Sequence, residues 1–167
     1  MTTSTTAPEP NRIPIDLPST VANSLKGACG IFLKDLRALP EDSFGRSFGG
    51  KTRTVADIVH EVNLVQDHMG LTIRGEELFD WPEGWITAPE NQRTKEAVIS
   101  AFEKSSAQIL ETVEGLTYQD LERKIINEHG EQNVFHLCRH MTLHLWYHSG
   151  QLNFIQTILG DDAWHWV

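Results

Sequence analysis

The chain has 167 residues, of which 14 are basic and 23 acidic, and its formal net charge is −9 with histidine neutral. This length suits one domain with one core, and a hydrophobic content of 40% is enough to build it. The charge argues against nucleic acid and anionic membranes as partners, because both require a positively charged protein face. No apolar run approaches the length that crosses a bilayer, and the N-terminus lacks the apolar segment of a signal peptide. We therefore expect a cytoplasmic protein.

The sequence indicates one domain preceded by a tail. Residues 1–14 are rich in Thr, Ser and Pro, so we expect them to be flexible, and we expect residues 15–167 to form a single domain. The two cysteines, Cys29 and Cys138, lie far apart in apolar surroundings. This placement predicts two buried thiols and no disulfide.

Apolar residues recur at spacings of three and four in four segments, which predicts four long helices. The segments are residues 19–39, 54–75, 94–116 and 133–159. Pro40 ends the first helix, Thr54 with Asp57 three residues later caps the second, and Gly160 follows the last. A short helical turn is expected at 117–123, and no segment shows a strand pattern, because the β-branched residues are spread through helical patterns. The sequence therefore predicts an all-α four-helix bundle with long connections.

The longest predicted connection, residues 79–93, contains Trp81, Trp85 and two prolines. A loop of this length and aromatic content is usually packed onto its domain, so we expect it to cover a pocket or an interface. On the last helix, Trp146 falls opposite the apolar stripe, so a partner or another segment of the chain should cover it. The candidate interface anchors are the tryptophans at positions 81, 85, 146, 164 and 166.

Four of the eight histidines stand four residues apart on the last predicted helix: His136, His140, His144 and His148. The apolar stripe of this helix has one gap, which His148 fills: Leu137, Met141, Leu145, Leu152, Ile155 and Leu159. His144 lies about 40° from that position, whereas His140 and His136 lie about 80° and about 120° away, toward solvent. Two inward histidines one turn apart can share a metal ion, which satisfies one nitrogen of each ring. They can also be core histidines that bond to neighbouring groups.

A metal site needs at least a third ligand, and four histidines outside this helix are candidates: His60, His68, His129 and His165. His129 falls in a predicted loop, and His165 falls near the C-terminus. His60 and His68 both belong to the second predicted helix, and neither lies on its main apolar stripe. The apolar pattern favours His60, which shares a flank with two leucines, without deciding between them.

His60 in ADIVHEVN, followed on the last helix by H-x3-H-x-G-Q in HLWYHSGQLNFIQTILG, forms a joint pattern. This pattern resembles the DinB-like superfamily of small metalloproteins, which includes bacillithiol S-transferase relatives. The resemblance covers about residues 19–160 and implies a four-helix bundle, often homodimeric, with a metal held by three histidines. Those histidines correspond to His60, His144 and His148. Many relatives carry Arg where this chain has Ser149, so any binding of a substrate anion by that arginine has no counterpart here.

Three neutral histidines on a divalent ion leave coordination positions open for water or a thiol, whose pKa the ion lowers. Zn²⁺ or Ni²⁺ is expected with imidazole ligands, and Fe²⁺ is an alternative. The resemblance implies a metal-dependent transferase that activates a low-molecular-weight thiol, or a related hydrolase. Glu61, Asp67 and His140 are candidates for a general base, and Gln151 either orients a ligand or makes a packing contact. A metal-binding or dimerising stress-response bundle without catalysis is the alternative, and the sequence does not decide whether the protein is an enzyme.

Overall fold

The structure is a computed structural model that describes residues 14–127 and 130–166. The expected flexible tail and His129 therefore fall outside the described residues, apart from residue 14. The elements, in chain order, are α1 (Leu17–Ala38), η1 (Glu41–Ser43), α2 (Val55–Arg74), η2 (Glu90–Gln92), α3 (Lys95–Glu114), α4 (Tyr118–Glu122), β1 (Lys124–Asn127), β2 (Gly130–Asn133) and α5 (Val134–Ile158).

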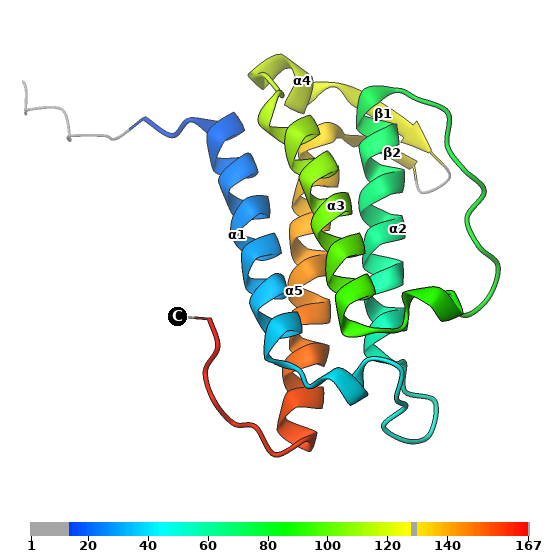
Figure 1. The fold of residues 1–167 in the computed structure, drawn as a ribbon. Coiled ribbons are helices and arrows are strands. Elements are labelled where there is room, and N and C mark those ends of the chain that lie inside the picture. Colours follow the sequence, from blue (N-terminus) through cyan, green and yellow to red (C-terminus); the bar gives the residue numbers. More distant parts are fainter. Residues whose placement is uncertain (1–13, 128–129, 167) are drawn as a thin grey trace, which may run out of the picture.

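The four long helices α1, α2, α3 and α5 form the predicted bundle (Figure 1). Helices α1 and α5 run in one direction along it, and α2 and α3 run in the other. Each long helix packs against two others, because α1 and α2 both contact α3 and α5. Since α2 and α3 run in the same direction, the chain has to travel back along the whole bundle after α2 before α3 can begin. Residues 75–94 make this return along the outside of α2.

Local capping sets where the helices begin and end. Thr54 and Asp57 form a reciprocal capping box at the start of α2, as the sequence predicts. Gly75 ends that helix with φ 72°, a left-handed conformation that glycine adopts without steric cost. The short helical turn is also confirmed as α4, which Thr117 and Asp120 cap in the same way. None of the helices in the described part of the chain is long and apolar enough to cross a membrane.

The expectation that the chain contains no strand is wrong, because β1 and β2 form an antiparallel hairpin at one end of the bundle. Each strand has only four residues, and β2 has the sequence GEQN, which contains no β-branched or aromatic residue. Pairing with the adjacent strand supplies the ordering that residue preference does not. The hairpin leads into α5, whose N-cap Asn133 accepts a hydrogen bond from the His136 backbone N–H.

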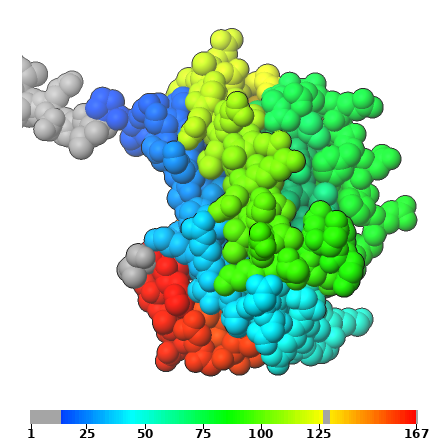
Figure 2. Space-filling view, in the orientation of Figure 1, coloured from blue at the N-terminus to red at the C-terminus, as the bar shows by residue number. Residues whose placement is uncertain are grey.

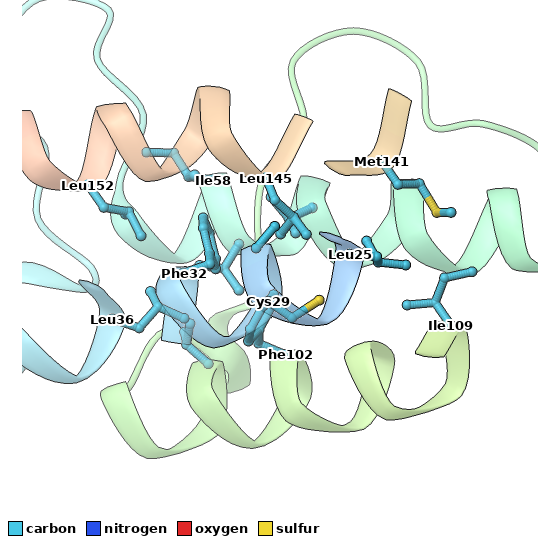
Figure 3. Packing of buried hydrophobic residues seen from close by; sticks show 14 of the residues in the cluster. Leu25, Cys29, Phe32, Leu36, Ile58, Phe102, Ile109, Met141, Leu145 and Leu152 are labelled. Carbon is cyan, nitrogen blue, oxygen red and sulfur yellow. The ribbon is translucent and has the colours of Figure 1, made fainter. Parts of the chain in front are cut away.

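The core fills the space between the four long helices (Figure 3). Phe32 of α1 and Phe102 of α3 pack with their ring centroids 4.8 Å apart, and both side chains are fully buried. Both cysteines, Cys29 and Cys138, are buried free thiols as predicted. Burial raises the pKa of each thiol to about 11, so neither cysteine is a reactive nucleophile near neutral pH.

The long connection is packed onto the bundle, as its composition predicts. Asp57 Oδ1 accepts a hydrogen bond of 2.8 Å from the Ala88 backbone N–H. Arg93 reaches the same carboxylate at 3.4 Å and donates to the Ala88 carbonyl at 2.9 Å. Ile86 and Ala88 are buried, which leaves Trp85 projecting next to the start of α2.

The C-terminal residues turn back beside α1 (Figure 2, red next to light blue). Lys34 donates a hydrogen bond of 2.9 Å to the Trp166 carbonyl, and Trp166 Nε1 donates one of 2.8 Å to Asp35. The Trp166 ring packs against Trp146 with centroids 5.3 Å apart. Another segment of the chain therefore covers part of Trp146, which leaves 40% of that residue exposed.

Candidate metal centre

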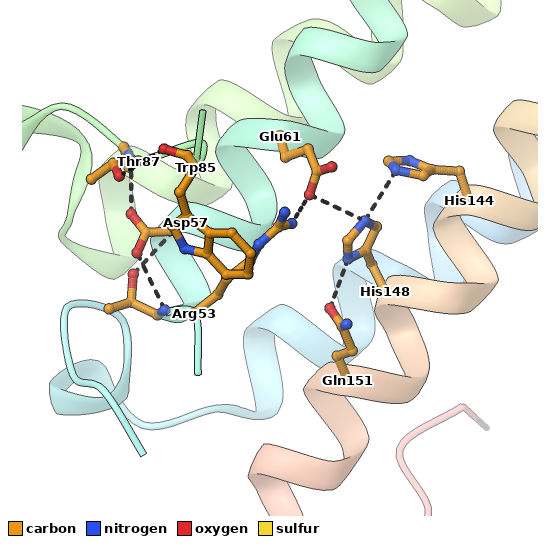
Figure 4. A network of polar contacts seen from close by, with 10 residues as sticks. Arg53, Asp57, Glu61, Trp85, Thr87, His144, His148 and Gln151 are labelled. Atoms are coloured by element: carbon orange, nitrogen blue, oxygen red, sulfur yellow. Dashed lines mark hydrogen bonds and ion pairs between the residues drawn. The ribbon is translucent and has the colours of Figure 1, made fainter. Parts of the chain in front are cut away.

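Three side chains with metal-binding atoms converge between α2 and α5: Glu61, His144 and His148 (Figure 4). One ligand atom from each lies within 4.8 Å of the other two. The Nε2 atoms of His144 and His148 are 3.0 Å apart, and Glu61 Oε2 lies 3.6 Å from His148 Nε2. His148 is buried, with 1% of its surface exposed, and His144 is half-buried at the edge of the core.

The orientation of the His148 ring is set by Gln151, one turn further along α5. His148 Nδ1 is 2.8 Å from Gln151 Oε1, an oxygen that accepts hydrogen bonds and cannot donate them. Nδ1 therefore carries the proton, and Nε2 presents its lone pair toward His144 and Glu61. This is the arrangement of a histidine ligand whose second nitrogen is held by a neighbouring group.

The donor set fits a divalent transition metal. An ion about 2.0–2.1 Å from two imidazole nitrogens, at ligand angles of about 95–110°, places them about 3.0–3.4 Å apart. The two Nε2 atoms are 3.0 Å apart, at the lower end of that range. Two imidazoles with one carboxylate also match a ligand set of catalytic zinc sites, in which one position stays open.

Both imidazoles are neutral at neutral pH. Burial lowers the pKa of His144 from 6.5 to about 4, and the nearby charges of His148, His140 and Arg53 lower it further. Burial likewise lowers the pKa of His148 to about 4, and the charge of Arg53 adds to this, whereas the hydrogen bond that His148 Nδ1 donates to Gln151 raises it. Neutral rings are the form that binds metal, so the site needs no proton release from these ligands.

A cation from the chain itself stands beside the site. Arg53 forms an ion pair with Glu61, and its guanidinium carbon lies 4.5 Å from the centre of the Trp85 ring. A metal ion on Glu61 would compete with Arg53 for the carboxylate charge. Arg53 also holds Trp85, and with it the long connection, next to the metal-binding atoms (Figure 4).

His60 is not part of this cluster. It lies half-buried on the α3 side of α2, where it lines a small depression with Val98 and Ala101. Burial lowers its pKa, while the charge of Asp57 and a hydrogen bond with Gln92 raise it. An α-helix turns about 100° per residue, so a histidine and the glutamate next to it face different neighbours. The three-histidine ligand set that the resemblance implies stays a prediction.

The other histidines with described surroundings also lie apart from the cluster. His68 packs edge-on against Phe79 and Trp81, with centroids 5.3 Å and 5.7 Å away. His165 Nε2 lies 2.9 Å from Asp161. The side chains of His136 and His140 are exposed. Only His140 approaches the site, with its ring 6.1 Å from that of His144.

Among the candidate general bases, Glu61 is in the cluster and Asp67 is not. Asp67 accepts a hydrogen bond of 2.9 Å from Ser105 on α3. The sequence pattern suggests Glu61 as a base but does not indicate that it lies beside His144 and His148, and it gives no sign of the neighbouring Arg53. A usable signal was present, because Ile58 and Glu61 are three residues apart and share the flank of α2 that faces α5.

Ser149, the position at which the resemblance implies arginine in many relatives, points away from the site. It is buried, and its hydroxyl donates to Asp35 of α1. The neighbouring residue on the other side, Gly150, faces open space, and a Cβ atom there would have no neighbour within 4 Å. Position 149 therefore belongs to the contact between α1 and α5, and position 150 belongs to the outer face of α5.

Comparison with known proteins supports the same fold. A crystal structure of the mycothiol-dependent maleylpyruvate isomerase matches with a TM-score of 0.63 and 14% identity, over 84% of this chain and 61% of that chain. A His-to-Ala mutant of that enzyme matches with a TM-score of 0.60, 12% identity and the same coverage. The chain thus spans 61% of the length of these enzymes, and at such identity the likeness concerns the fold alone.

No curated protein matches the sequence. A sequence profile described as the DinB superfamily matches residues 8–152, which include most of the bundle and all three residues of the cluster. The chain therefore belongs to the DinB superfamily.

Proposed function

We propose that Glu61, His144 and His148 hold a divalent metal ion, and that the protein is a transferase that activates a low-molecular-weight thiol. The observation that carries this proposal is the convergence of three metal-binding atoms within 4.8 Å, at the edge of a cavity. The mycothiol dependence of the enzyme with a similar fold supports a thiol as the co-substrate.

A bound divalent ion supplies Lewis acidity, which lowers the pKa of a thiol or water at its open position. The chain's own residues prepare the site. Gln151 holds the His148 proton on Nδ1, and burial keeps both imidazoles neutral. The thiol has to come from a small molecule, because both cysteines are buried with a pKa raised to about 11.

The proposed reaction is a transfer to an electrophilic carbon of a small-molecule substrate. The sulfur forms the new C–S bond, the leaving group departs with the electrons of the broken bond, and the thiol proton balances its charge. With water in place of the thiol, the same site is that of a hydrolase. Zn²⁺ or Ni²⁺ suits two imidazoles and a carboxylate, with Fe²⁺ as the alternative. A cytoplasmic homodimer is part of the proposal.

The first test is the metal content of the purified chain without a histidine tag, measured by elemental mass spectrometry. Wild type should hold about one ion per chain, and Glu61→Ala and His148→Ala should each lose it. His60→Ala is the matched control on α2, and it should retain the metal. A wild type that stays metal-free after reconstitution would refute the proposal. Loss in His60→Ala with retention in Glu61→Ala would restore the three-histidine set.

Turnover is tested separately with metal-loaded wild type, a panel of thiols and an electrophile that changes colour on substitution. Thiol-dependent product formation that Glu61→Ala abolishes supports the transferase. Product formation without thiol identifies the hydrolase. A metal-loaded protein that forms no product with any thiol or with water supports the non-catalytic alternative.

A further inference from the structure

The metal-binding atoms lie at the edge of a cavity of about 740 Å³. That volume falls within the range of about 300–1,000 Å³ that is typical of small-molecule sites. The cavity follows the outer face of α5 from His144 to Ile158, which corresponds to about 21 Å of helix. The loop before α2 and Trp85 of the long connection form the opposite wall. The cavity therefore has room for a ligand considerably longer than the few atoms that the cluster contacts.

The charges that line this cavity are mostly positive, although the whole chain carries −9. Its charged lining residues are Lys51, Arg53 and Glu61. Arg53 is paired with Glu61, which leaves Lys51 as the cation without a carboxylate partner among the described residues. An anionic group on a ligand would pair with Lys51, whereas a cationic group at that position would be repelled by it.

Much of the remaining lining is apolar, and several of these apolar side chains are exposed. Tyr147, Phe154 and Ile158 are 64%, 67% and 51% exposed, and their spacing of seven and four residues places them on one face of α5. Trp85, which is 63% exposed, stands across the cavity on the Arg53 guanidinium. Covering such rings with an apolar group removes their surface from water, which is favourable by about 25 cal/mol per Å².

We infer that this cavity binds an apolar-bodied carboxylate, with the carboxylate at Lys51 and the apolar body between Trp85 and the outer face of α5. Only the idea that this ligand is the electrophilic substrate rests on the proposed function. Its binding depends on the cavity residues and not on a metal. Lys51 and Phe154 are outside the metal cluster, so each can be changed without altering a proposed ligand.

Binding can be measured by calorimetry on the full chain dialysed free of metal, with 4-phenylbutyrate and its neutral isostere 4-phenylbutanamide. We expect the carboxylate to bind about tenfold more tightly than the amide. Lys51→Gln should remove that difference, and Lys104→Gln, the same change on the exposed surface of α3, should preserve it. Phe154→Ser should weaken both ligands, whereas Leu143→Ser, at an equally apolar exposed position of α5 that does not line the cavity, should weaken neither.

Equal affinity for the carboxylate and the amide would overturn the anion preference, as would an unchanged preference in Lys51→Gln. Absence of binding by either compound at millimolar concentration would overturn the inference as a whole. These results can be told apart from the test of the proposed function. A chain that binds 4-phenylbutyrate but never binds metal supports the carboxylate site and refutes the metal centre. A metal-loaded chain that binds neither compound supports the metal centre and refutes the carboxylate site.

Discussion

At the level of single residues, the contact between His148 and Gln151 decides which nitrogen is available to a metal. The Gln151 oxygen, 2.8 Å from Nδ1, selects the tautomer with a free Nε2. Without this acceptor, the buried ring would populate both tautomers and more than one orientation. In the proposed metal site, Gln151 is a positioning residue that acts through His148.

We therefore expect Gln151→Ala to weaken metal binding by about 10- to 100-fold without changing its stoichiometry. The affinity is measured by competition with a chelating dye. Gln108→Ala, on the exposed face of α3, is the control for loss of a glutamine from a helix. An affinity equal to that of wild type would show that the protein sets the His148 tautomer by another route.

The lowered pKa values of His144 and His148 predict a pH-dependent stability. In the unfolded chain both titrate near 6.5, and in the folded chain burial lowers the pKa of each to about 4. Between those values the unfolded chain binds more protons than the folded one. Stability of the metal-free protein should therefore be complete above about pH 6.5 and should fall as the pH drops toward about 4.

Urea unfolding at a series of pH values measures this dependence. His144→Gln with His148→Gln should flatten the slope, because the protonation difference disappears. His136→Gln, at an exposed position of the same helix, is the control. A slope that persists in the first variant would assign the dependence to other groups.

Helix periodicity predicts only part of the site. The gap in the apolar stripe of α5 predicts the buried position of His148, because burial within one helix follows its own periodicity. Periodicity cannot state which neighbour a polar flank faces. His60 and Glu61 both lie off the main stripe of α2, and only the packing places His60 toward α3 and Glu61 toward α5.

At the level of elements, the sequence predicts the helices better than the connections. The long helices and the turn at α4 carry apolar periodicity and capping residues that act locally. The β1–β2 hairpin has neither signal, since GEQN becomes a strand only by pairing with Lys124–Asn127. The 75–94 connection is anchored through contacts with Asp57, which its own composition does not reveal.

Asp57 has two structural roles, because it completes the capping box of α2 and also binds the Ala88 N–H of the long connection. Asp57→Ala should destabilise the fold by about 2–4 kcal/mol, through loss of the cap and of a buried hydrogen bond. Asp120→Ala removes the equivalent capping box of α4, where the hydrogen bonds of the Asp120 side chain go to Thr117, and should cost only about 1 kcal/mol. Chemical denaturation measures both values, and equal losses would mean that the Ala88 contact contributes nothing.

At the level of the whole molecule, the order of the helices in space comes from contacts between distant segments. The sequence predicts four helices, but not that α2 and α3 run parallel or that the C-terminal residues return to α1. Asp35 of α1 holds the C-terminal segment in place, because it accepts hydrogen bonds from both Ser149 and Trp166. These partners are more than 100 residues away in the chain, so no local pattern identifies them.

The protonation of the Asp35 carboxyl affects the stability of the whole bundle. Burial raises its pKa, although hydrogen bonds from Ser149 and Trp166 lower it. Because the pKa of Asp35 is higher in the folded chain than in the unfolded chain, the folded chain keeps this proton to a higher pH. The contribution of Asp35 to stability is therefore full below its ordinary pKa of 3.8, and it declines as the pH rises through the pKa of the folded chain. Near neutral pH the buried charge is thus a net cost, which a neutral acceptor of the same shape avoids.

Asp35→Asn should therefore be at least as stable as wild type near neutral pH, because its amide oxygen still accepts from Trp166. Asp35→Ala should lose about 1–3 kcal/mol, because it leaves the Ser149 hydroxyl and the Trp166 indole N–H without their acceptor. Urea unfolding compares the two variants, and Trp166→Phe removes one of the two donors as a control. If Asp35→Asn lost as much stability as Asp35→Ala, the negative charge itself would be needed to hold the C-terminal segment against α1 and α5.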